Sequence, residues 1–169
     1  MYIKGILWTA ACGLSAVCVA ALPAGADPVR ARGAGELRDV QLATAQPTDH
    51  ATAQVTASES DGTTTVTLKV QGLDHAAAGT ELGAHIHVGT CVEGDGAAAG
   101  PHYNSGGPAS PSTEVWLDFE VQADGTGDAA TTVPFVIPAG AAHSLIVHEH
   151  DTHADGTAGP RWACLPVDF

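Results

Sequence analysis

The stretch ATAQVTASESDGTTTVTLKV, residues 51–70, contains two runs in which apolar and polar residues alternate. The runs are Ala51 to Ala57 and Thr64 to Val70, and Asp61-Gly62 between them is a common turn pair in β-hairpins. Alternation with a period of two places the apolar side chains on one face of a strand, where they can be buried. Residues 51–70 therefore predict a β-hairpin with one buried face.

Similar short segments recur on both sides of this hairpin. They are separated by Gly, Pro and Asp, including a second turn pair at Asp124-Gly125, and no stretch keeps helical periodicity for three turns. This pattern predicts an all-β domain of about eight short antiparallel strands in a sandwich or barrel. The further strands are expected at Asp39 to Ala45, Ala84 to Val88, Val115 to Val121, Ala129 to Val136, Ser144 to Val147 and Trp162 to Val167.

Two long segments between the expected strands are irregular. They run from Gly89 to Thr113 and from Glu149 to Pro160. Long loops without structure of their own are uncommon in compact domains unless they serve a function. We therefore expect functional residues in both loops.

Residues 1–26 have the composition of a secretory signal peptide. Lys4 precedes an apolar run from Gly5 to Ala21, and Ala24-Gly25-Ala26 supplies the small residues that signal peptidase needs. The run is shorter than the roughly 20 apolar residues of a spanning helix, which disfavours a membrane anchor. Lipid attachment at Cys18 is a weaker alternative because Val17 is a large residue before it. Cleavage after Ala26 would give a secreted, periplasmic or cell-envelope protein.

The chain after Ala26 is expected to have two parts. Asp27 to Glu36 consists largely of Pro, Gly, Ala and Arg without a period, which predicts a mobile N-terminal segment. The folded domain is expected to begin near Leu37 and to span residues 37–169.

Two of the four cysteines, Cys91 and Cys164, remain after removal of the signal peptide. An even pair in an exported protein predicts a disulfide, with two free thiols as the alternative. A disulfide that closes the loop between Cys91 and Cys164 would stabilise the fold by roughly 4 kcal/mol.

The mature chain is strongly acidic. All 19 acidic residues follow Ala26, as do five of the six basic residues, so the net charge is −14 with histidine neutral. Nucleic acid and anionic membrane surfaces are therefore poor partners. An anionic substrate would be repelled at long range, so a cation near an active site would indicate where such a substrate binds. Arg161 is the only basic residue in the last hundred positions.

Four histidines occur in a pattern that is typical of a metal site. His85 and His87 lie two residues apart on an expected strand and so project from one face. His102 lies in the first long loop, and His148 ends a strand just before the second. Imidazole ligands without a thiolate favour copper or zinc, and square-planar nitrogen ligation suits cupric ion.

The remaining histidines carry less information. His150 and His153, in the sequence HEHDTH, are either exposed loop residues or part of a second ion site. His50, His75 and His143 are isolated in the sequence and are interpreted as turn or surface residues.

Four ordered motifs resemble those of the copper/zinc superoxide dismutase family. GAHIH at 83–87 is similar to the family's paired copper ligands, and AGPHYN at 99–104 to the segment of its bridging histidine. VHE at 147–149 resembles its last copper ligand, and AGPRWAC at 158–164 its closing arginine-cysteine motif. Together with the strand spacing from about Ala51 to Phe169, the resemblance covers most of the mature chain.

The resemblance implies an eight-stranded antiparallel Greek-key barrel or sandwich of immunoglobulin-like type. It implies copper bound by His85, His87, His102 and His148, with Arg161 guiding the anionic substrate and Cys91 bonded to Cys164. The family's reaction converts superoxide to dioxygen and hydrogen peroxide. In that reaction His102 would be the catalytic imidazole that releases copper and takes up a proton.

Two departures from the family pattern concern zinc and the second loop. No histidine lies between His102 and His143, so a structural zinc site is not expected. The loop between His148 and Arg161 is also shorter than its counterpart in the family. Together the two departures resemble the copper-only branch of the family. There a carboxylate orients the former bridging imidazole, and we expect Glu114 in that role, with Asp118 as the second choice.

The leading hypothesis is therefore an extracytoplasmic copper-dependent superoxide dismutase that works without zinc. A non-enzymatic copper-binding or copper-delivery protein on the same fold is the second hypothesis, and a metal-free structural β-domain is the third. The expected partners are superoxide and a copper donor, and the sequence leaves the oligomeric state open.

Overall fold

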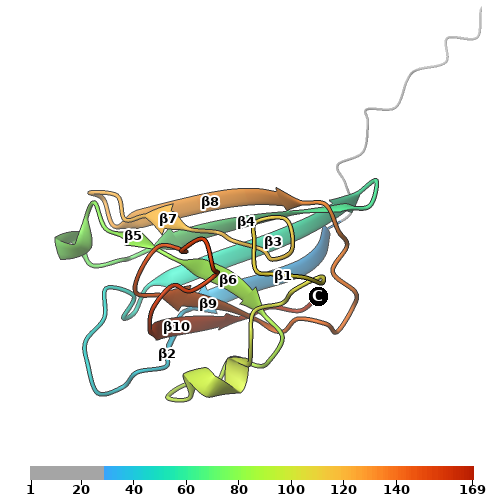
Figure 1. Cartoon of the computed structure of the whole chain (residues 1–169). Helices are drawn as coiled ribbons and strands as arrows, with labels where there is room; N and C mark the ends of the chain where they lie inside the picture. The colour runs from blue at the N-terminus through green and yellow to red at the C-terminus, as the bar shows by residue number, and fades with distance from the viewer. Residues whose placement is uncertain (1–28) are drawn as a thin grey trace, which may run out of the picture.

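The computed structural model describes residues 29–169, which form two antiparallel four-stranded sheets (Figure 1). One sheet has the order β1-β3-β4-β8 and the other β2-β10-β9-β6, while β5 pairs with β7 in a small third sheet. This architecture confirms the all-β prediction. Of the two predicted alternatives, a sandwich and a barrel, it is the sandwich. The elements are β1 Val29–Glu36, β2 Arg38–Asp39, β3 Thr52–Ser60, β4 Thr63–Gln71, η1 His75–Ala77, β5 Glu81–Leu82, β6 Ala84–His87, η2 Gly96–Ala99, β7 Phe119–Glu120, β8 Thr126–Val133, β9 Ser144–His148 and β10 Arg161–Pro166.

The hairpin formed by β3 and β4 confirms the prediction for residues 51–70. The two strands pair in register from Thr52–Gln71 to Ser60–Thr63. Asp61 and Gly62 have φ angles of 50° and 80°, the left-handed values that a tight two-residue hairpin turn requires. The apolar residues of the alternation are buried between the sheets, as one-sided burial predicts; they include Val55, Val66, Leu68 and Val70.

The expectation of a mobile segment from Asp27 to Glu36 is wrong for the residues of it that the structure describes, Val29 to Glu36. Val29–Glu36 is strand β1, which pairs with β3 along its length. Ala31 and Gly33 face inward, and a Cβ on Gly33 would lie 2.4 Å from the carbonyl oxygen of Pro166. Because the inward positions of β1 need small residues, its inward and outward side chains alternate without the large apolar residues that would reveal a strand in the sequence.

The expected strand from Asp39 to Ala45 is also corrected. Only Arg38 and Asp39 pair with β10. The Asp39 carboxylate accepts a hydrogen bond of 2.6 Å from the backbone N–H of Gln41, which turns the chain away from the sheet. Leu42 is consequently 66% exposed.

The segment from Val115 to Val121 alternates as predicted, but only Phe119–Glu120 forms a strand. Its apolar residues Val115, Leu117, Phe119 and Val121 are all buried in the core. The intervening side chains project from the other face of the segment. This alternation brings Glu114, Trp116 and Asp118 to the side where the histidines lie.

The pairing of β6 with β9 positions the histidines. These strands are far apart in the sequence, yet His85 lies opposite Ile146 and His87 opposite Ser144. Non-sequential neighbours of this kind, and likewise β4 with β8, are typical of Greek-key connections. The pairing brings His148, the last residue of β9, beside the two histidines of β6.

Within residues 29–169, no helix has the length and apolar character needed to span a membrane. The predicted signal peptide, residues 1–26, lies outside the described residues.

Candidate metal centre

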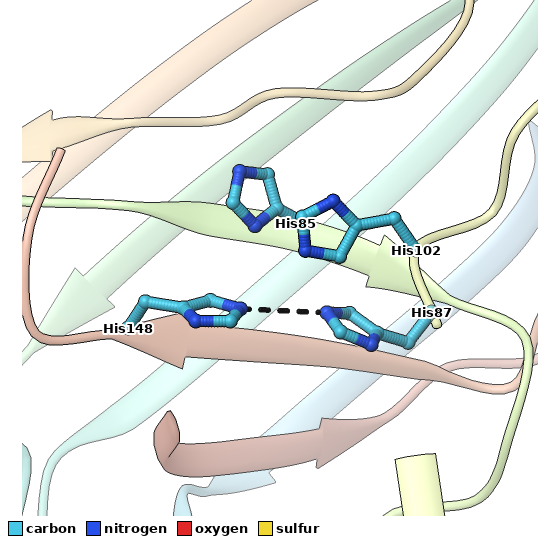
Figure 2. Close-up of side chains that lie close together, drawn as sticks. All are labelled: His85, His87, His102 and His148. Atoms are coloured by element: carbon cyan, nitrogen blue, oxygen red, sulfur yellow. Dashed lines mark hydrogen bonds between the residues drawn. The ribbon is translucent and has the colours of Figure 1, made fainter. Parts of the chain in front are cut away.

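The four histidines predicted as copper ligands lie together. His85 and His87 come from β6, His102 from the first long loop and His148 from the end of β9 (Figure 2). One ring nitrogen from each lies within 4.8 Å of the corresponding nitrogens of the other three. Among residues 29–169 this is the one group of metal-ligating side chains with such geometry. His150 and His153 are exposed and outside it.

Three of the four imidazoles are oriented by a hydrogen bond at Nδ1. The Nδ1–H of His87 donates to the carbonyl oxygen of Gly100 at 3.1 Å, and that of His148 to Gly159 at 3.2 Å. His102 Nδ1 donates to the Glu114 carboxylate at 2.9 Å. Because carbonyl and carboxylate oxygens only accept, each neutral ring keeps its lone pair on Nε2.

His85 has the opposite orientation. Its Nε2 lies 2.6 Å from the Thr152 hydroxyl, whereas its Nδ1 is buried without a hydrogen-bond partner. A buried polar atom without a partner costs free energy and calls for an explanation. A metal ion among the four rings would give Nδ1 of His85 its partner.

A second contact also fits a cation. The Nε2 atoms of His87 and His148 are 3.4 Å apart, and both rings already donate through Nδ1. In the neutral tautomers this contact joins two lone pairs. A cation accepting both lone pairs turns a repulsive contact into coordination.

Burial keeps three of the imidazoles, those of His85, His87 and His148, neutral, which is the form that binds metals. Desolvation is the main cause that lowers the pKa of His87 to about 2 and that of His148 to about 4. Burial likewise lowers the pKa of His85 far below the usual range of histidine, with a smaller effect from His102. Three buried neutral imidazoles with converging lone pairs fit a transition-metal ion.

Glu114 is the carboxylate beside His102. It is buried and accepts hydrogen bonds from His102 Nδ1 at 2.9 Å, Trp116 Nε1 at 2.9 Å and Asn104 Nδ2 at 3.0 Å. Desolvation raises its pKa, but the three hydrogen bonds outweigh this effect and the pKa falls below its ordinary value. Glu114 is therefore an anion at neutral pH.

Asp118, the second choice for contact with His102, lies beside a different histidine. Its Oδ1 is 4.0 Å from Nε2 of His85, and it accepts hydrogen bonds from the Thr152 hydroxyl and backbone N–H at 2.6 and 2.8 Å. The structure thus assigns the two carboxylates to different rings.

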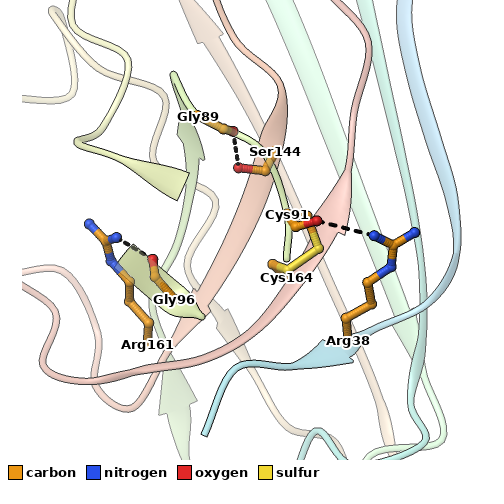
Figure 3. Close-up of a disulfide and its surroundings, with 7 residues drawn as sticks. All are labelled: Arg38, Gly89, Cys91, Gly96, Ser144, Arg161 and Cys164. Atoms are coloured by element: carbon orange, nitrogen blue, oxygen red, sulfur yellow. Dashed lines mark hydrogen bonds between the residues drawn. A yellow bond between two sulfur atoms is a disulfide. The ribbon is translucent and has the colours of Figure 1, made fainter. Parts of the chain in front are cut away.

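Arg161 and the disulfide hold the first long loop (Figure 3). The guanidinium of Arg161 donates to the carbonyl oxygens of Gly96 and Gly100, both at 2.6 Å. Cys91 is disulfide-bonded to Cys164, with Cα atoms 5.5 Å apart. Since Gly100 also accepts from His87, Arg161 is coupled to a histidine of the cluster through one carbonyl oxygen.

Comparison with known proteins agrees with this geometry. The model of the copper/zinc superoxide dismutase family matches residues 50–165, which is more than half of the chain. The chain belongs to this family. No curated protein matches the chain.

A solved structure supports the family's fold. It is the crystal structure of a double mutant of a SOD-like protein from Bacillus subtilis, with a TM-score of 0.57 and 22% identity. The match covers 80% of this chain and 95% of that chain. At this identity the likeness shows the superoxide dismutase fold and nothing finer.

Three residues of the site were not predicted from the sequence. Trp116 and Asn104 bond to Glu114, and Thr152 bonds to His85. Trp116 had a usable signal, because it alternates with the buried residues of the segment 115–121. Thr152 had none, because a threonine in an irregular loop has no distinguishing pattern.

Proposed function

We propose that the chain is an extracytoplasmic copper-dependent superoxide dismutase that works without zinc. The observation that supports this proposal most directly is the cluster of four imidazoles. In each ring the nitrogen that points away from the cluster is hydrogen-bonded, and the lone pair of the other nitrogen is free to bind a metal. An all-imidazole ligand set without a carboxylate or thiolate suits copper. The Cys91–Cys164 disulfide supports an oxidising, extracytoplasmic compartment.

Copper bound to these ligands would supply one-electron chemistry, in which one superoxide is oxidised to dioxygen and a second takes up an electron and two protons to give hydrogen peroxide. His102 is the ligand best suited to handle a proton. Its side chain is 17% exposed, whereas His85, His87 and His148 are buried. With Nδ1–H held by the anionic Glu114, His102 can take up a proton at Nε2, and the carboxylate stabilises the resulting imidazolium.

The contact between His102 and Glu114 supports independence from zinc. In the family's dimetal members the outward nitrogen of the bridging histidine binds zinc, whereas here that nitrogen donates to Glu114 at 2.9 Å. Zinc at this position would have to displace a hydrogen bond to a carboxylate that Trp116 and Asn104 also hold. A hydrogen bond between charged and neutral partners in a buried place is costly to break.

The experiment that tests the proposal is reconstitution of the mature protein with copper alone and with copper plus zinc. We expect one copper per chain and equally fast superoxide consumption in both samples. Fast consumption only in the sample with zinc would disprove zinc independence. Copper binding with consumption no faster than that of free cupric ion would favour the second candidate function.

That second candidate is copper binding or delivery without turnover. The specific observation in its favour is that both terminal nitrogens of Arg161 donate to loop carbonyls, so the residue already has a structural task. The solved relative is also described as a SOD-like protein. A carrier would release copper readily to a chelator.

Replacement of Arg161 by alanine separates the two functions. The guanidinium is the one cation in the last hundred residues of an acidic protein, and we propose that it attracts the superoxide anion. We expect Arg161→Ala to keep its copper and to lose most of its superoxide consumption, with a weaker dependence of the remaining rate on ionic strength. Lys69→Ala, on the opposite sheet, is the control, and unchanged turnover in Arg161→Ala would remove the residue from the mechanism.

Replacement of Glu114 by glutamine tests its role beside His102. An amide cannot raise the basicity of the imidazole as a carboxylate does, and loss of such a partner typically lowers metal affinity by about 10–100-fold. We expect a loss of this size for Glu114→Gln in a competition titration with a copper chelator. Glu120→Gln, which changes an exposed carboxylate on β7, should leave the affinity unchanged. Equal affinity of Glu114→Gln and the wild type would contradict the assignment.

A further inference from the structure

The second long loop, Glu149 to Pro160, touches the histidine cluster at two rings: the carbonyl oxygen of Gly159 accepts from His148, and the Thr152 side chain lies against His85. His87 and His148 donate to backbone carbonyls and His102 to a carboxylate, but the outward nitrogen of His85 faces the hydroxyl of Thr152 at 2.6 Å. A hydroxyl can donate or accept, so it does not by itself determine which nitrogen of His85 carries the proton. A further group must decide this.

Asp118 decides the direction of the hydrogen bond. Its Oδ1 lies 2.6 Å from the Thr152 hydroxyl, and an ionised carboxylate can only accept. The hydroxyl proton of Thr152 therefore points to Asp118. The oxygen of Thr152 is left to accept from Nε2–H of His85, and the lone pair of His85 is placed on Nδ1.

The carboxylate cannot do this directly. Oδ1 of Asp118 is 4.0 Å from Nε2 of His85, which is beyond hydrogen-bond distance. Its two oxygens are also engaged by the backbone N–H of Thr152 at 2.8 Å and that of Ala84 at 3.3 Å. Asp118 thus holds Thr152 at two points and acts on His85 through it.

The backbone is built for this close approach. The N–H of Gly83 donates to the carbonyl oxygen of His150 at 2.7 Å, which ties the second long loop to the start of β6. A Cβ on Gly83 would lie 2.5 Å from that carbonyl oxygen and 3.3 Å from the Thr152 hydroxyl. Any larger residue at position 83 would therefore force the loop backbone at His150 to shift.

We propose that Thr152 is a positioning residue that sets the tautomer of His85, so that Nδ1 rather than Nε2 is presented to the metal. The inference rests on the metal site of the proposed function. It explains why Nδ1 of His85 is buried without a partner, and it gives the second long loop a defined role. The direction of every bond in the chain from Asp118 to Thr152 to His85 follows from which atoms can donate.

The first test uses metal-free protein. The ¹⁵N shifts and two-bond couplings of the His85 ring report which nitrogen carries the proton. We expect the Nε2–H tautomer in the wild type and in Thr152→Ser, and a substantial population of Nδ1–H in Thr152→Val, which keeps the shape but lacks the hydroxyl. Thr157→Val is the matched control, because the Thr157 hydroxyl donates to Asp155 at 2.7 Å in the same loop and bonds to no histidine of the cluster.

The second test uses copper. Loss of a group that orients a metal-bound histidine typically costs about tenfold or more in affinity, so Thr152→Val should bind cupric ion at least about tenfold more weakly, with an altered electron paramagnetic resonance spectrum. Thr152→Ser should recover both properties, and Thr157→Val should keep them. Thermal melting verifies that each variant is folded, and Thr152→Ala replaces Thr152→Val if the valine variant does not fold.

The outcomes separate this inference from the proposed function. An unchanged His85 tautomer and unchanged copper affinity in Thr152→Val would overturn the role of Thr152 while leaving the copper site intact. A lower melting temperature with the wild-type tautomer and spectrum would reduce Thr152 to a structural residue and would likewise overturn it. If the wild type binds no copper, the proposed function fails, and the tautomer measurement still decides the role of Thr152.

Discussion

Cupric ion is expected to raise the melting temperature of the wild-type protein by on the order of 10 °C, and His87→Gln should abolish this rise. A ligand at a thousand times its dissociation constant stabilises the folded state by about 4 kcal/mol, which corresponds to such a shift in a domain of this size. His87 is fully buried, and its Nε2 is 3.4 Å from that of His148. Its loss removes one of four ligands and leaves a site too poor to bind tightly.

The control for this experiment is His50→Gln. The side chain of His50 is 92% exposed and belongs to a surface pair with Glu36. Its replacement should leave the copper-induced shift intact in a thermal melt followed by circular dichroism. A full shift in His87→Gln would mean that copper binds elsewhere, and loss of the shift in His50→Gln would point to the surface.

Replacement of both Cys91 and Cys164 by serine is expected to lower the free energy of unfolding by about 4 kcal/mol. The disulfide closes a loop across a sequence separation of 73 residues, which restricts the unfolded chain. Denaturant titration measures the loss. Copper affinity should fall as well, because the bridge anchors the loop whose Gly100 carbonyl orients His87.

Reduction supplies the matched comparison. The wild type treated with a reductant should become as unstable as the double serine variant, and the reductant should not affect the variant. The same loop is also held by hydrogen bonds from Arg38 to Cys91, from Ser144 to Gly89 and from Arg161 to Gly96 (Figure 3). A loss below about 1 kcal/mol would mean that these bonds, at about 1 kcal/mol each, suffice to hold the loop in place.

Four strands, β3, β4, β6 and β9, begin and end within a few residues of the predicted limits. In β4, Val66, Leu68 and Val70 at alternate positions make the burial of one face visible in the sequence, whereas β6 and β9 are buried along their whole length. The alternation of β1 is carried by Ala31 and Gly33, which are too small to register. In 115–121 the alternation predicted burial correctly, but burial of one face does not require a neighbouring strand.

The four clustered histidines were predictable from residue type and position. Two histidines at positions i and i+2 of a strand must share a face, His102 in the first long loop and His148 at a strand end completed the set, and the family resemblance implied their role as copper ligands. The partners of the rings were less accessible. Glu114 was the first choice for the carboxylate beside His102 and lies there, whereas Asp118, the second choice, lies beside His85.

The sequence by itself determined the fold class, the family and the side chains that can bind a metal, because each of these depends on residue type at short, regular spacing. Only the tertiary structure decided which nitrogen of each histidine faces the centre. That choice depends on groups brought together by β6, β9 and two loops: the carbonyls of Gly100 and Gly159, the carboxylate of Glu114 and the hydroxyl of Thr152. Hydrogen bonds between residues up to 67 positions apart leave no periodic trace in a sequence, since they require only that the two groups meet in space.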